Sequence, residues 1–265
     1  MKKKLFITFG CSWMYGVGVG YHSGQSVTEY YANAWDPVVC DTKSFRGVLS
    51  KNFGLDNKNF SMGGSSNQHQ FNSAKKYFGS YDFKKDQEIY EDIIVLHAIT
   101  STARNVFFDP VTQQVIHFKY FDNYKSPIYD KFGKFMCKYA YDHNYEVMLL
   151  EQEMHFWNIF YESTGIKNIW VDTINHHLYH YTVKNMIDIE NRDLLSQLCI
   201  KNNINKFDNK YHYSDQINQS HAKIDSNRIK FLINIGLLNP ISNHPTEQGH
   251  LQIAEFIAPV LESKL

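Results

Sequence analysis

The chain has 265 residues, of which 43% are apolar, and this is enough for one sizeable α/β domain with a buried core. Lysine and arginine together number 27, as do aspartate and glutamate, so the formal net charge is zero. A balanced chain lacks the summed positive field that draws proteins to nucleic acids or anionic membranes, so the composition argues against both partners.

The start of the chain lacks the pattern of an export signal. The apolar run after the N-terminal lysines spans about five residues, shorter than the roughly 7–15 residues of a signal-peptide core. No window approaches the roughly 20 apolar residues that a membrane-spanning helix needs. The cysteines lie far apart, without a CxxC pair, at Cys11, Cys40, Cys137 and Cys199. We therefore expect a cytoplasmic protein with reduced cysteines.

Short apolar runs predict buried strands at several points along the chain. The first covers residues 4–9 and is followed by a glycine, and a weaker one covers 58–60. The strongest run is 93–96, and 147–150 is the next strongest. Another weak run covers 169–171. Runs of this length fit strands that are buried on both faces of a sheet.

Segments with helical periodicity lie between these strands. Residues 67–78 and 129–141 place apolar side chains along one side of a helix. A last helix begins near Pro245 or Thr246, where proline suits the first turn. Strands that alternate with helices are typical of βαβ units. We therefore predict a three-layer α/β/α fold with a central parallel sheet, of the flavodoxin-like kind.

Residues 175–238 have a less regular pattern that is polar and rich in asparagine, histidine and tyrosine. Helices are expected there over 176–189, 192–201 and 226–235. No linker or internal repeat separates this stretch from the rest of the chain. We interpret it as an insertion or cap within a single domain that covers residues 1–265.

Three segments follow predicted strands or open the last helix, at the edge where ligands bind in open parallel sheets. The first is Gly10-Cys11-Ser12, the second is Ser61-Met62-Gly63-Gly64-Ser65-Ser66-Asn67, and the third is His244-Pro245-Thr246. Because the carboxyl ends of parallel strands meet at one edge, we expect Ser12 and His244 to come together there.

In order and spacing, these segments resemble the sequence blocks of the SGNH (GDSL-like) hydrolases. Gly10-Cys11-Ser12 resembles the nucleophile block, the Gly63 segment resembles the glycine block, and His244 resembles the histidine block. The sequence around these blocks is most similar to uncharacterised SGNH-like proteins of bacteriophages. The resemblance implies an SGNH-hydrolase-like fold and ester hydrolysis. For a viral source it implies a location in the host cytoplasm or the virion, with phage structural partners.

The residue types suit acyl transfer to a serine. A serine hydroxyl becomes nucleophilic when a histidine takes its proton across a hydrogen bond of about 2.6–3.2 Å. Ser12 would be the nucleophile, and His244 would be the base and then the acid. Backbone N–H groups of Ser12 and of Gly63 or Gly64 would stabilise the oxyanion, with the Asn67 amide as a further donor. This chemistry needs no metal and no organic cofactor.

One departure from the family pattern concerns the oxyanion hole. The asparagine of the third block is missing from the aligned stretch, residues 97–104. Thr100, or Asn67 from the neighbouring loop, would have to replace it, and Arg104 would bind an anionic or sugar substituent. Trp13, next to the nucleophile, is a further candidate for substrate contact.

A second departure concerns the triad. The acid that normally lies three residues before the histidine is replaced by Ile241, which cannot stabilise an imidazolium. Losing the third member of a serine triad can cost about 10⁴ in turnover. Asn239 or Asn243 could hold the ring instead, or Asp225 could reach it from the insertion, and the sequence leaves these alternatives open.

The same motifs also have plain structural explanations. Ser12 could cap the helix after the first strand, and Gly63 and Gly64 could form a tight turn. Cys11 is a weaker candidate nucleophile, because no lowered pKa can be argued for it from sequence. The glycine repeat over residues 16–20 matches neither GxGxxG nor a phosphate loop. A solvated or aromatic-packed face is favoured over a metal site for His176, His177 and His180.

Two hypotheses follow from the sequence. The first is an SGNH-type ester hydrolase that acts on a small-molecule or glycan O-acyl ester, such as a carbohydrate O-acetyl group, through an acyl-Ser12 intermediate. The second is a catalytically silent SGNH-like protein that binds glycans or serves as a structural component of a phage particle. Ile241 and the missing third-block asparagine motivate the second hypothesis.

Overall fold

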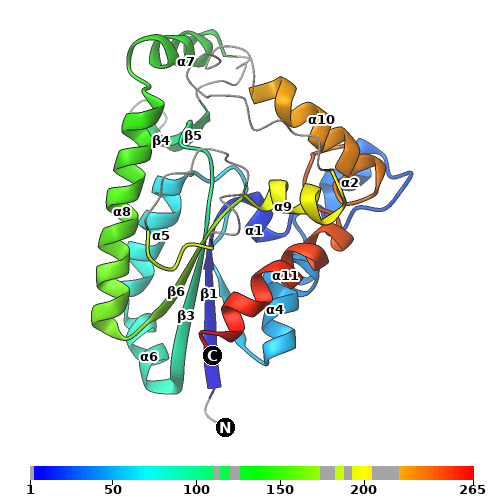
Figure 1. Cartoon of the computed structure of the whole chain (residues 1–265). Coiled ribbons are helices and arrows are strands. Elements are labelled where there is room, and N and C mark those ends of the chain that lie inside the picture. Colours follow the sequence, from blue (N-terminus) through cyan, green and yellow to red (C-terminus); the bar gives the residue numbers. More distant parts are fainter. Residues whose placement is uncertain (1–2, 110–113, 120–125, 174–182, 188–192, 205–220) are drawn as a thin grey trace.

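The computed structural model describes residues 3–109, 114–119, 126–173, 183–187, 193–204 and 221–265, and a four-stranded parallel sheet lies at their centre (Figure 1). The strand order is β2-β1-β3-β6. Adjacent strands pair in parallel throughout. Their carboxyl ends therefore meet at one edge of the sheet. The strand bounds are β1 Lys3–Phe9, β2 Asp56–Asn59, β3 Tyr90–Ile99 and β6 Lys167–Asp172.

Helices cover both faces of the sheet, because its strands send alternate side chains to opposite sides. Leu5 and Ile7 of β1 belong to one buried cluster and Phe6 belongs to the other. The first face is covered by α5 Asn67–Phe78, α6 Tyr81–Ile89 and α8 His143–Thr164 (Figure 1). The second is covered by α1 Ser12–Tyr15, α4 Phe45–Phe53, α9 Leu194–Lys201 and α11 Glu247–Glu262. The predicted three-layer α/β/α fold is therefore confirmed.

The remaining described helices are α2 Val27–Asn33, α3 Pro37–Lys43, α7 Pro127–Tyr139 and α10 His221–Asn234. An antiparallel hairpin, β4 Arg104–Asp109 and β5 Gln114–Lys119, follows β3. This hairpin was not predicted from the sequence, although both strands contain β-branched and aromatic residues.

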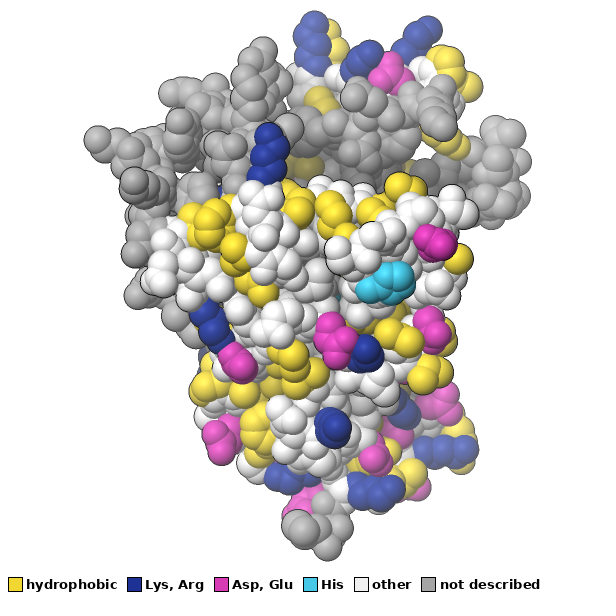
Figure 2. Space-filling model, turned by 90° about the vertical axis from the view of Figure 1, so that its right-hand side faces the viewer, with side chains coloured by type: hydrophobic (Ala, Val, Ile, Leu, Met, Phe, Trp, Pro, Cys, Tyr) yellow, Lys and Arg dark blue, Asp and Glu magenta, His cyan; other side chains and the backbone are white. Residues whose placement is uncertain are grey.

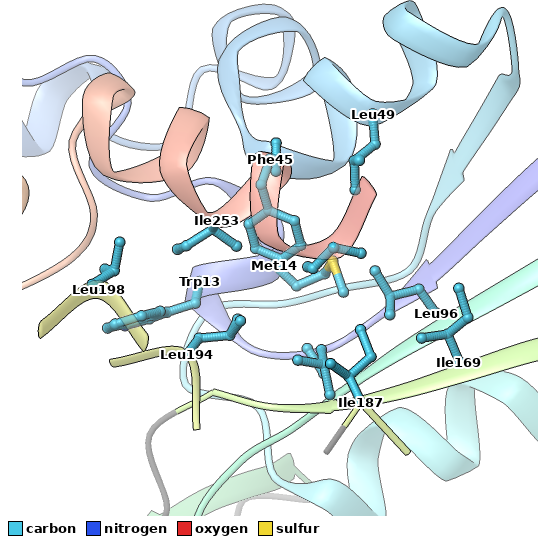
Figure 3. Close-up of a cluster of buried hydrophobic side chains, with 14 of the residues drawn as sticks. Trp13, Met14, Phe45, Leu49, Leu96, Ile169, Ile187, Leu194, Leu198 and Ile253 are labelled. Atoms are coloured by element: carbon cyan, nitrogen blue, oxygen red, sulfur yellow. The ribbon is translucent and has the colours of Figure 1, made fainter. Parts of the chain in front are cut away.

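Packing anchors the short helix α1 at the carboxyl edge of the sheet. A four-residue helix has too few hydrogen bonds to be stable by itself. Trp13 and Met14 are buried in the cluster that contains Phe45 and Leu96. In Figure 3, Met14 lies next to Phe45 of α4, and Trp13 lies next to Leu194 and Leu198 of α9. Each fully buried side chain of this size contributes about 1.5–3 kcal/mol. The core therefore fixes the residue that precedes them, Ser12.

The strand predicted over residues 147–150 is wrong, because these residues lie inside α8. A short apolar run fits a buried strand and a buried helix segment equally well. The longer pattern decides the matter, since Leu150, Met154, Trp157 and Tyr161 are all buried at helical spacing. The Asp142 side chain caps this helix by accepting a hydrogen bond from the Tyr145 backbone N–H at 2.8 Å.

The other predicted elements are found, one with the predicted ends and the rest with shifted ends. Residues 67–78 form α5, and the 129–141 helix begins two residues earlier, with Pro127 in its first turn. The 58–60 and 169–171 runs correspond to β2 and β6, and the last helix begins after Thr246, whose side chain caps it.

In the stretch interpreted as an insertion, α9 and α10 correspond to the 192–201 and 226–235 helices. The helix predicted over 176–189 is wrong at 183–187, which contain a turn and an isolated bridge from Met186 to Trp170, and its other residues lie outside the described part. Leu194 of α9 and Leu232 of α10 belong to the main core cluster. The division of the chain into one domain with an insertion stays a prediction.

The described surface mixes charges of both signs. Figure 2 shows the face that carries α4 and α11, where basic and acidic side chains alternate and apolar side chains form separate small groups. One such pair is Lys43 with Glu247 at 2.7 Å. No helix among the described residues combines the length and apolar character needed to cross a membrane.

Candidate active site

Ser12 lies at the carboxyl edge of the sheet, as the first residue of α1 after β1. Gly10 permits the sharp turn between them, because a Cβ at this position would lie 2.6 Å from the Cβ of Met14 and 3.0 Å from that of Ala98. Any side chain at residue 10 would push α1 away from β3. Steric crowding therefore explains why residue 10, in the predicted nucleophile block, is a glycine.

His244 lies in the loop before α11, and its side chain meets Ser12. The distance from His244 Nε2 to Ser12 Oγ is 2.7 Å. Ser12 is buried and His244 is half-buried. The two residues predicted as nucleophile and base are thus brought within hydrogen-bond distance, which is the geometry that proton transfer from a serine hydroxyl requires.

The other ring nitrogen of His244 contacts a residue that the sequence analysis missed. Nδ1 lies 2.9 Å from the hydroxyl oxygen of Ser242. That oxygen lies 2.7 Å from the Tyr30 hydroxyl and 3.0 Å from Oδ1 of Asn239. Of the supports left open for the ring, Asn239 therefore acts through Ser242. The two other partners of the Ser242 hydroxyl, Tyr30 and Asn239, are neutral side chains.

The backbone of the loop explains why Ser242 takes this position. Asn239 Oδ1 accepts hydrogen bonds from the backbone N–H groups of Ser242 at 2.8 Å and Ile241 at 3.2 Å. Asn243 then turns the chain with a φ of 57°, a left-handed conformation that asparagine tolerates. This turn places Ser242, and not Ile241, beside His244. The side chain of Asp225 lies outside the described residues.

The glycine repeat over residues 16–20 has a steric role next to this loop. Gly18 has a φ of 110°, and a Cβ there would lie 2.2 Å from the Pro245 carbonyl oxygen and 3.0 Å from the Cβ of His244. A residue with a side chain would displace the histidine loop. Gly18 of this repeat, which resembled a nucleotide motif only loosely, therefore allows close backbone approach.

Two backbone segments near Ser12 carry N–H groups suited to an oxyanion. Ser12 begins a helix whose N-cap residue, Cys11, makes no side-chain cap hydrogen bond. The Gly63-Gly64 turn is joined to the nucleophile loop by a hydrogen bond from the Met62 backbone N–H to the Gly10 carbonyl at 3.1 Å. The N–H groups of Gly63 and Gly64 have no acceptor among the described residues.

Trp35 covers the turn at Gly63. A Cβ on Gly63 would lie 2.0 Å from the indole ring, so the ring packs directly against this residue. Trp35 remains 44% exposed. Its ring lies 5.5 Å from that of Tyr15, and the Tyr15 hydroxyl donates to its carbonyl at 3.3 Å. The sequence analysis gave no signal for this contact, which joins three distant segments.

The side chain of Asn67 is engaged with the backbone of Thr100. Its Nδ2 donates to the Thr100 carbonyl at 2.7 Å and its Oδ1 accepts from the Thr100 N–H at 2.9 Å. Gln70 donates to the same Oδ1 at 3.0 Å. These contacts join the start of α5 to the end of β3. The role of Asn67 as an oxyanion donor stays a prediction, with one amide hydrogen already in use.

The candidate substrate contacts are placed in different surroundings. Thr100 is fully buried, and its hydroxyl has no hydrogen-bond partner among the described residues. Arg104 begins β4 and is half-buried, with a buried Nη1 that likewise has no partner in this part of the chain. Trp13 is 6% exposed and packs with Leu194 and Leu198 (Figure 3). Their roles toward a substrate stay predictions.

A buried guanidinium supports the C-terminal end of α1. Arg46 is fully buried, and it donates to the carbonyls of Met14 at 3.1 Å and Tyr15 at 3.3 Å. It also forms an ion pair with Asp41. A positive charge at a helix C-terminus interacts favourably with the negative end of the helix dipole. Sequence reasoning missed Arg46, because arginine is usually expected at the surface.

Two groups near His244 keep fixed protonation states around neutral pH. Burial raises the pKa of Tyr30, although its hydrogen bonds with Ser242 and Asn239 act in the opposite direction, so its hydroxyl keeps the proton. Burial, together with the electrostatic effect of the nearby His244 ring, lowers the pKa of His250 to about 3. His250 is therefore neutral, and its Nδ1 accepts the Phe45 backbone N–H at 3.3 Å.

No group of three or more histidine, cysteine, aspartate or glutamate side chains that could hold a metal ion occurs within the described ranges. The three histidines at 176, 177 and 180 lie outside those ranges. Ser12 and His244 are the central pair of the site described above.

No protein-family model and no curated protein matches the chain. Among solved structures, it is similar to a protein assigned to the lipolytic G-D-S-L family from Desulfitobacterium hafniense DCB-2, with 13% identity, a TM-score of 0.38, and coverage of 98% of this chain and 99% of that one. It is also similar to the acetyl xylan esterase Est2A from the rumen bacterium Butyrivibrio proteoclasticus, with 14% identity and a TM-score of 0.45. That alignment covers all of this chain and 64% of the esterase. The function therefore has to be inferred from the site itself.

Proposed function

We propose that the protein is a serine ester hydrolase of the SGNH type, acting on an O-acyl ester through an acyl-Ser12 intermediate. One observation carries this proposal: the 2.7 Å contact between His244 Nε2 and Ser12 Oγ at the carboxyl edge of a parallel sheet. Nucleophile and base side chains at hydrogen-bond distance, with the base held by a third group, are the signature of an activated serine.

In the first half of the reaction, Ser12 Oγ attacks the ester carbonyl carbon while His244 Nε2 takes the hydroxyl proton. The tetrahedral intermediate collapses, its bond to the leaving oxygen breaks, and His244 returns the proton to the leaving alcohol. In the second half, His244 takes a proton from water, the hydroxide attacks the acyl-Ser12 carbonyl, and the carboxylic acid departs as Ser12 regains its proton.

The oxyanion of both intermediates would be stabilised by backbone N–H groups. The Ser12 N–H at the start of α1, together with Gly63 or Gly64, supplies donors from two loops that are hydrogen-bonded to each other. Donors fixed by the backbone need no reorganisation as charge develops, and removing one such donor typically costs about 10²–10³ in kcat. Arg46 and the core hold α1 in place during these steps.

The finer part of the proposal is the substrate, an O-acyl ester of a carbohydrate such as an acetylated sugar. It is supported by Trp35, whose ring packs on Gly63 and stays 44% exposed beside the proposed oxyanion donors. Aromatic rings supply flat apolar area on which the C–H face of a sugar ring can stack. No metal and no organic cofactor take part in the proposed mechanism.

A second candidate function is a catalytically silent protein of the same fold that binds glycans or serves as a structural component of a phage particle. The observation in its favour is the neutral hydroxyl of Ser242 in the position where a triad needs an acid. A neutral group gives an imidazolium less stabilisation than a carboxylate does.

Labelling with a fluorophosphonate probe, followed by peptide mass spectrometry, tests the proposal directly. We expect a phosphonyl adduct on Ser12 of the wild type and none in Ser12→Ala or His244→Ala, with all proteins shown to be folded by thermal melting. Hydrolysis of p-nitrophenyl acetate should be lost in the same two variants. A folded wild type that takes up no probe and hydrolyses no acetyl ester would exclude the hydrolase and leave the binding or structural protein.

A further inference from the structure

We infer that a network of Ser242, Tyr30 and Asn239 holds His244 in the one tautomer that can act as a base, with Ser242 as the direct partner of Nδ1. The inference deepens the proposed function and rests on it for its catalytic consequence. The tautomer itself is a property of the folded protein that can be measured separately.

The hydrogen bonds of the Asn239 side chain fix the orientation of its amide group. Its Oδ1 accepts the backbone N–H groups of Ile241 and Ser242, at 3.2 and 2.8 Å. Its Nδ2 donates to the His244 carbonyl at 3.1 Å. A flipped amide would oppose donors to donors and acceptors to acceptors. The oxygen of Asn239 must therefore face Ser242.

The Ser242 hydrogen follows from this orientation. Its hydroxyl oxygen lies 3.0 Å from Asn239 Oδ1, which can only accept. The Ser242 O–H therefore donates to Asn239. The Ser242 oxygen is left with acceptor capacity for two further hydrogens, and it has two close neighbours, the Tyr30 hydroxyl at 2.7 Å and His244 Nδ1 at 2.9 Å.

Tyr30 fills one of these two positions as a donor. Its hydroxyl accepts from Asn239 Nδ2 at 3.3 Å, so its own hydrogen points to Ser242. Tyr30 is 1% exposed, which keeps water from competing for either contact. The last position on the Ser242 oxygen then belongs to His244, and its Nδ1 must carry a hydrogen.

A neutral imidazole carries a hydrogen on only one of its two nitrogens. A protonated Nδ1 therefore leaves Nε2 with a lone pair that can accept a hydrogen bond. Nε2 is the atom that lies 2.7 Å from Ser12 Oγ. It can therefore accept the Ser12 proton, as a general base must. In an acidic triad the carboxylate fixes the same tautomer and adds a charge. Here a neutral hydroxyl, that of Ser242, fixes the same tautomer.

The test measures the tautomer by long-range ¹H–¹⁵N NMR of histidine-labelled protein at alkaline pH, where the ring is neutral. The His244 signals are assigned by their loss in His244→Gln. We expect a protonated Nδ1 and a bare Nε2 in the wild type, and a mixture of tautomers in Ser242→Ala. Ser163→Ala, which removes an exposed hydroxyl on α8, is the matched control and should match the wild type.

Kinetics supply the second readout. Ser242→Ala should slow probe labelling and acetyl-ester hydrolysis about tenfold, the value of one neutral hydrogen bond, and Tyr30→Phe should slow them less. Ser242→Asp adds a negative charge beside the ring. It should move the acidic limb of the pH–rate profile to higher pH, because a carboxylate favours the protonated imidazole. An acidic limb that stays in place in Ser242→Asp would contradict the contact between residue 242 and the His244 ring.

The outcomes separate the inference from the proposed function. A wild type with a protonated Nε2, or a Ser242→Ala variant with an unchanged tautomer and rate, overturns the inference while Ser12 labelling stands. A wild type that resists labelling but loses its Nδ1 hydrogen in Ser242→Ala overturns the hydrolase and supports the assigned tautomer. Loss of both the tautomer and the rate in Ser242→Ala supports both.

Discussion

The two halves of the candidate site are held by different kinds of interaction. The nucleophile half, α1 with Ser12, rests on buried side chains and on the charged Arg46, which binds the last carbonyls of the helix. The histidine half, the loop from Asn239 to His244, rests on neutral hydroxyl and amide hydrogen bonds. Packing and charge stabilise the nucleophile half strongly, whereas the histidine half depends on the exact course of one loop. We expect perturbations of the two halves to have different consequences.

The largest effect should come from Gly18→Ala, which strains the histidine half. The new Cβ would lie 2.2 Å from the Pro245 carbonyl oxygen, at a φ of 110° that alanine adopts poorly. We expect a loss of about 2–4 kcal/mol in the free energy of unfolding. If His244 is displaced by about 1 Å, the probe should also label Ser12 about 100-fold more slowly. Urea unfolding and probe labelling kinetics measure the two effects.

Gly20→Ala is the matched control for this change. It belongs to the same glycine repeat, but its nearest neighbours to a new Cβ are Asn33 O at 3.9 Å and Val39 Cγ1 at 4.0 Å. Its stability should stay within about 0.5 kcal/mol of the wild type. Equal behaviour of the two alanine variants would contradict the steric role assigned to Gly18.

The next largest effect concerns the nucleophile half. Arg46→Met removes the donors to Met14 and Tyr15 and leaves buried carbonyls unpaired, which should lower the free energy of unfolding by about 3 kcal/mol. Lys43→Met, which breaks the exposed ion pair with Glu247, should cost less than about 1 kcal/mol. Chemical denaturation compares them. If Arg46→Met costs no more than Lys43→Met, charge does not support α1.

The stability of the protein should depend on pH through two buried histidines. His250 lies behind the site and His97 lies in the core on the opposite face, and burial lowers the pKa of each to about 3. The unfolded chain binds their protons below about pH 6.5 and the folded chain does not, so stability is complete above that pH and falls as the pH decreases toward 3. The melting temperature should drop on the order of 5 °C per pH unit between pH 6 and 4.5.

Substitution of either histidine separates its share of this slope. His250→Asn and His97→Asn should each melt below the wild type at neutral pH and show about half of its decrease between pH 6 and 4.5. Differential scanning calorimetry over that range provides the comparison. An unaltered slope in both variants would mean that other groups cause the decrease.

The smallest effect belongs to Trp35, which covers Gly63 between the halves. Trp35→Ala should raise the KM for an acetylated sugar about threefold to tenfold, the value of one aromatic contact, and leave p-nitrophenyl acetate turnover nearly unchanged. Phe156→Ala removes another exposed aromatic side chain, on α8, and should change neither value. A KM for the sugar ester that is the same in both variants would rule out stacking at Trp35.

The sequence supports prediction where a local pattern determines the outcome. Residues 4–9, 67–78 and 93–96 have strong periodicity or continuous apolar character, and they lie in β1, α5 and β3. Residues 147–150 misled because four apolar residues fit both a strand and a helix. The positions of Ser12 and His244 followed from their places after a strand and before a helix, and their roles stay predictions.

The supports of the site could not be predicted, because they arise from tertiary structure. Ser242 lies beside His244 only because Asn243 adopts a left-handed conformation, and sequence spacing pointed to Ile241 instead. Tyr30 reaches Ser242 across 212 positions of the chain. Arginine is usually found at the surface, whereas Arg46 is fully buried.

The contact between Ser12 and His244 joins positions that are 232 residues apart. Contacts of such long range form late in folding, because most of the chain must be ordered before the ends of the loop meet. During synthesis, Ser12 leaves the ribosome long before His244, so the pair forms only when nearly all of the 265 residues have been made. In the proposed mechanism Ser12 is therefore not activated in the nascent chain, and labelling of Ser12 by a probe would report that the two distant segments have come together.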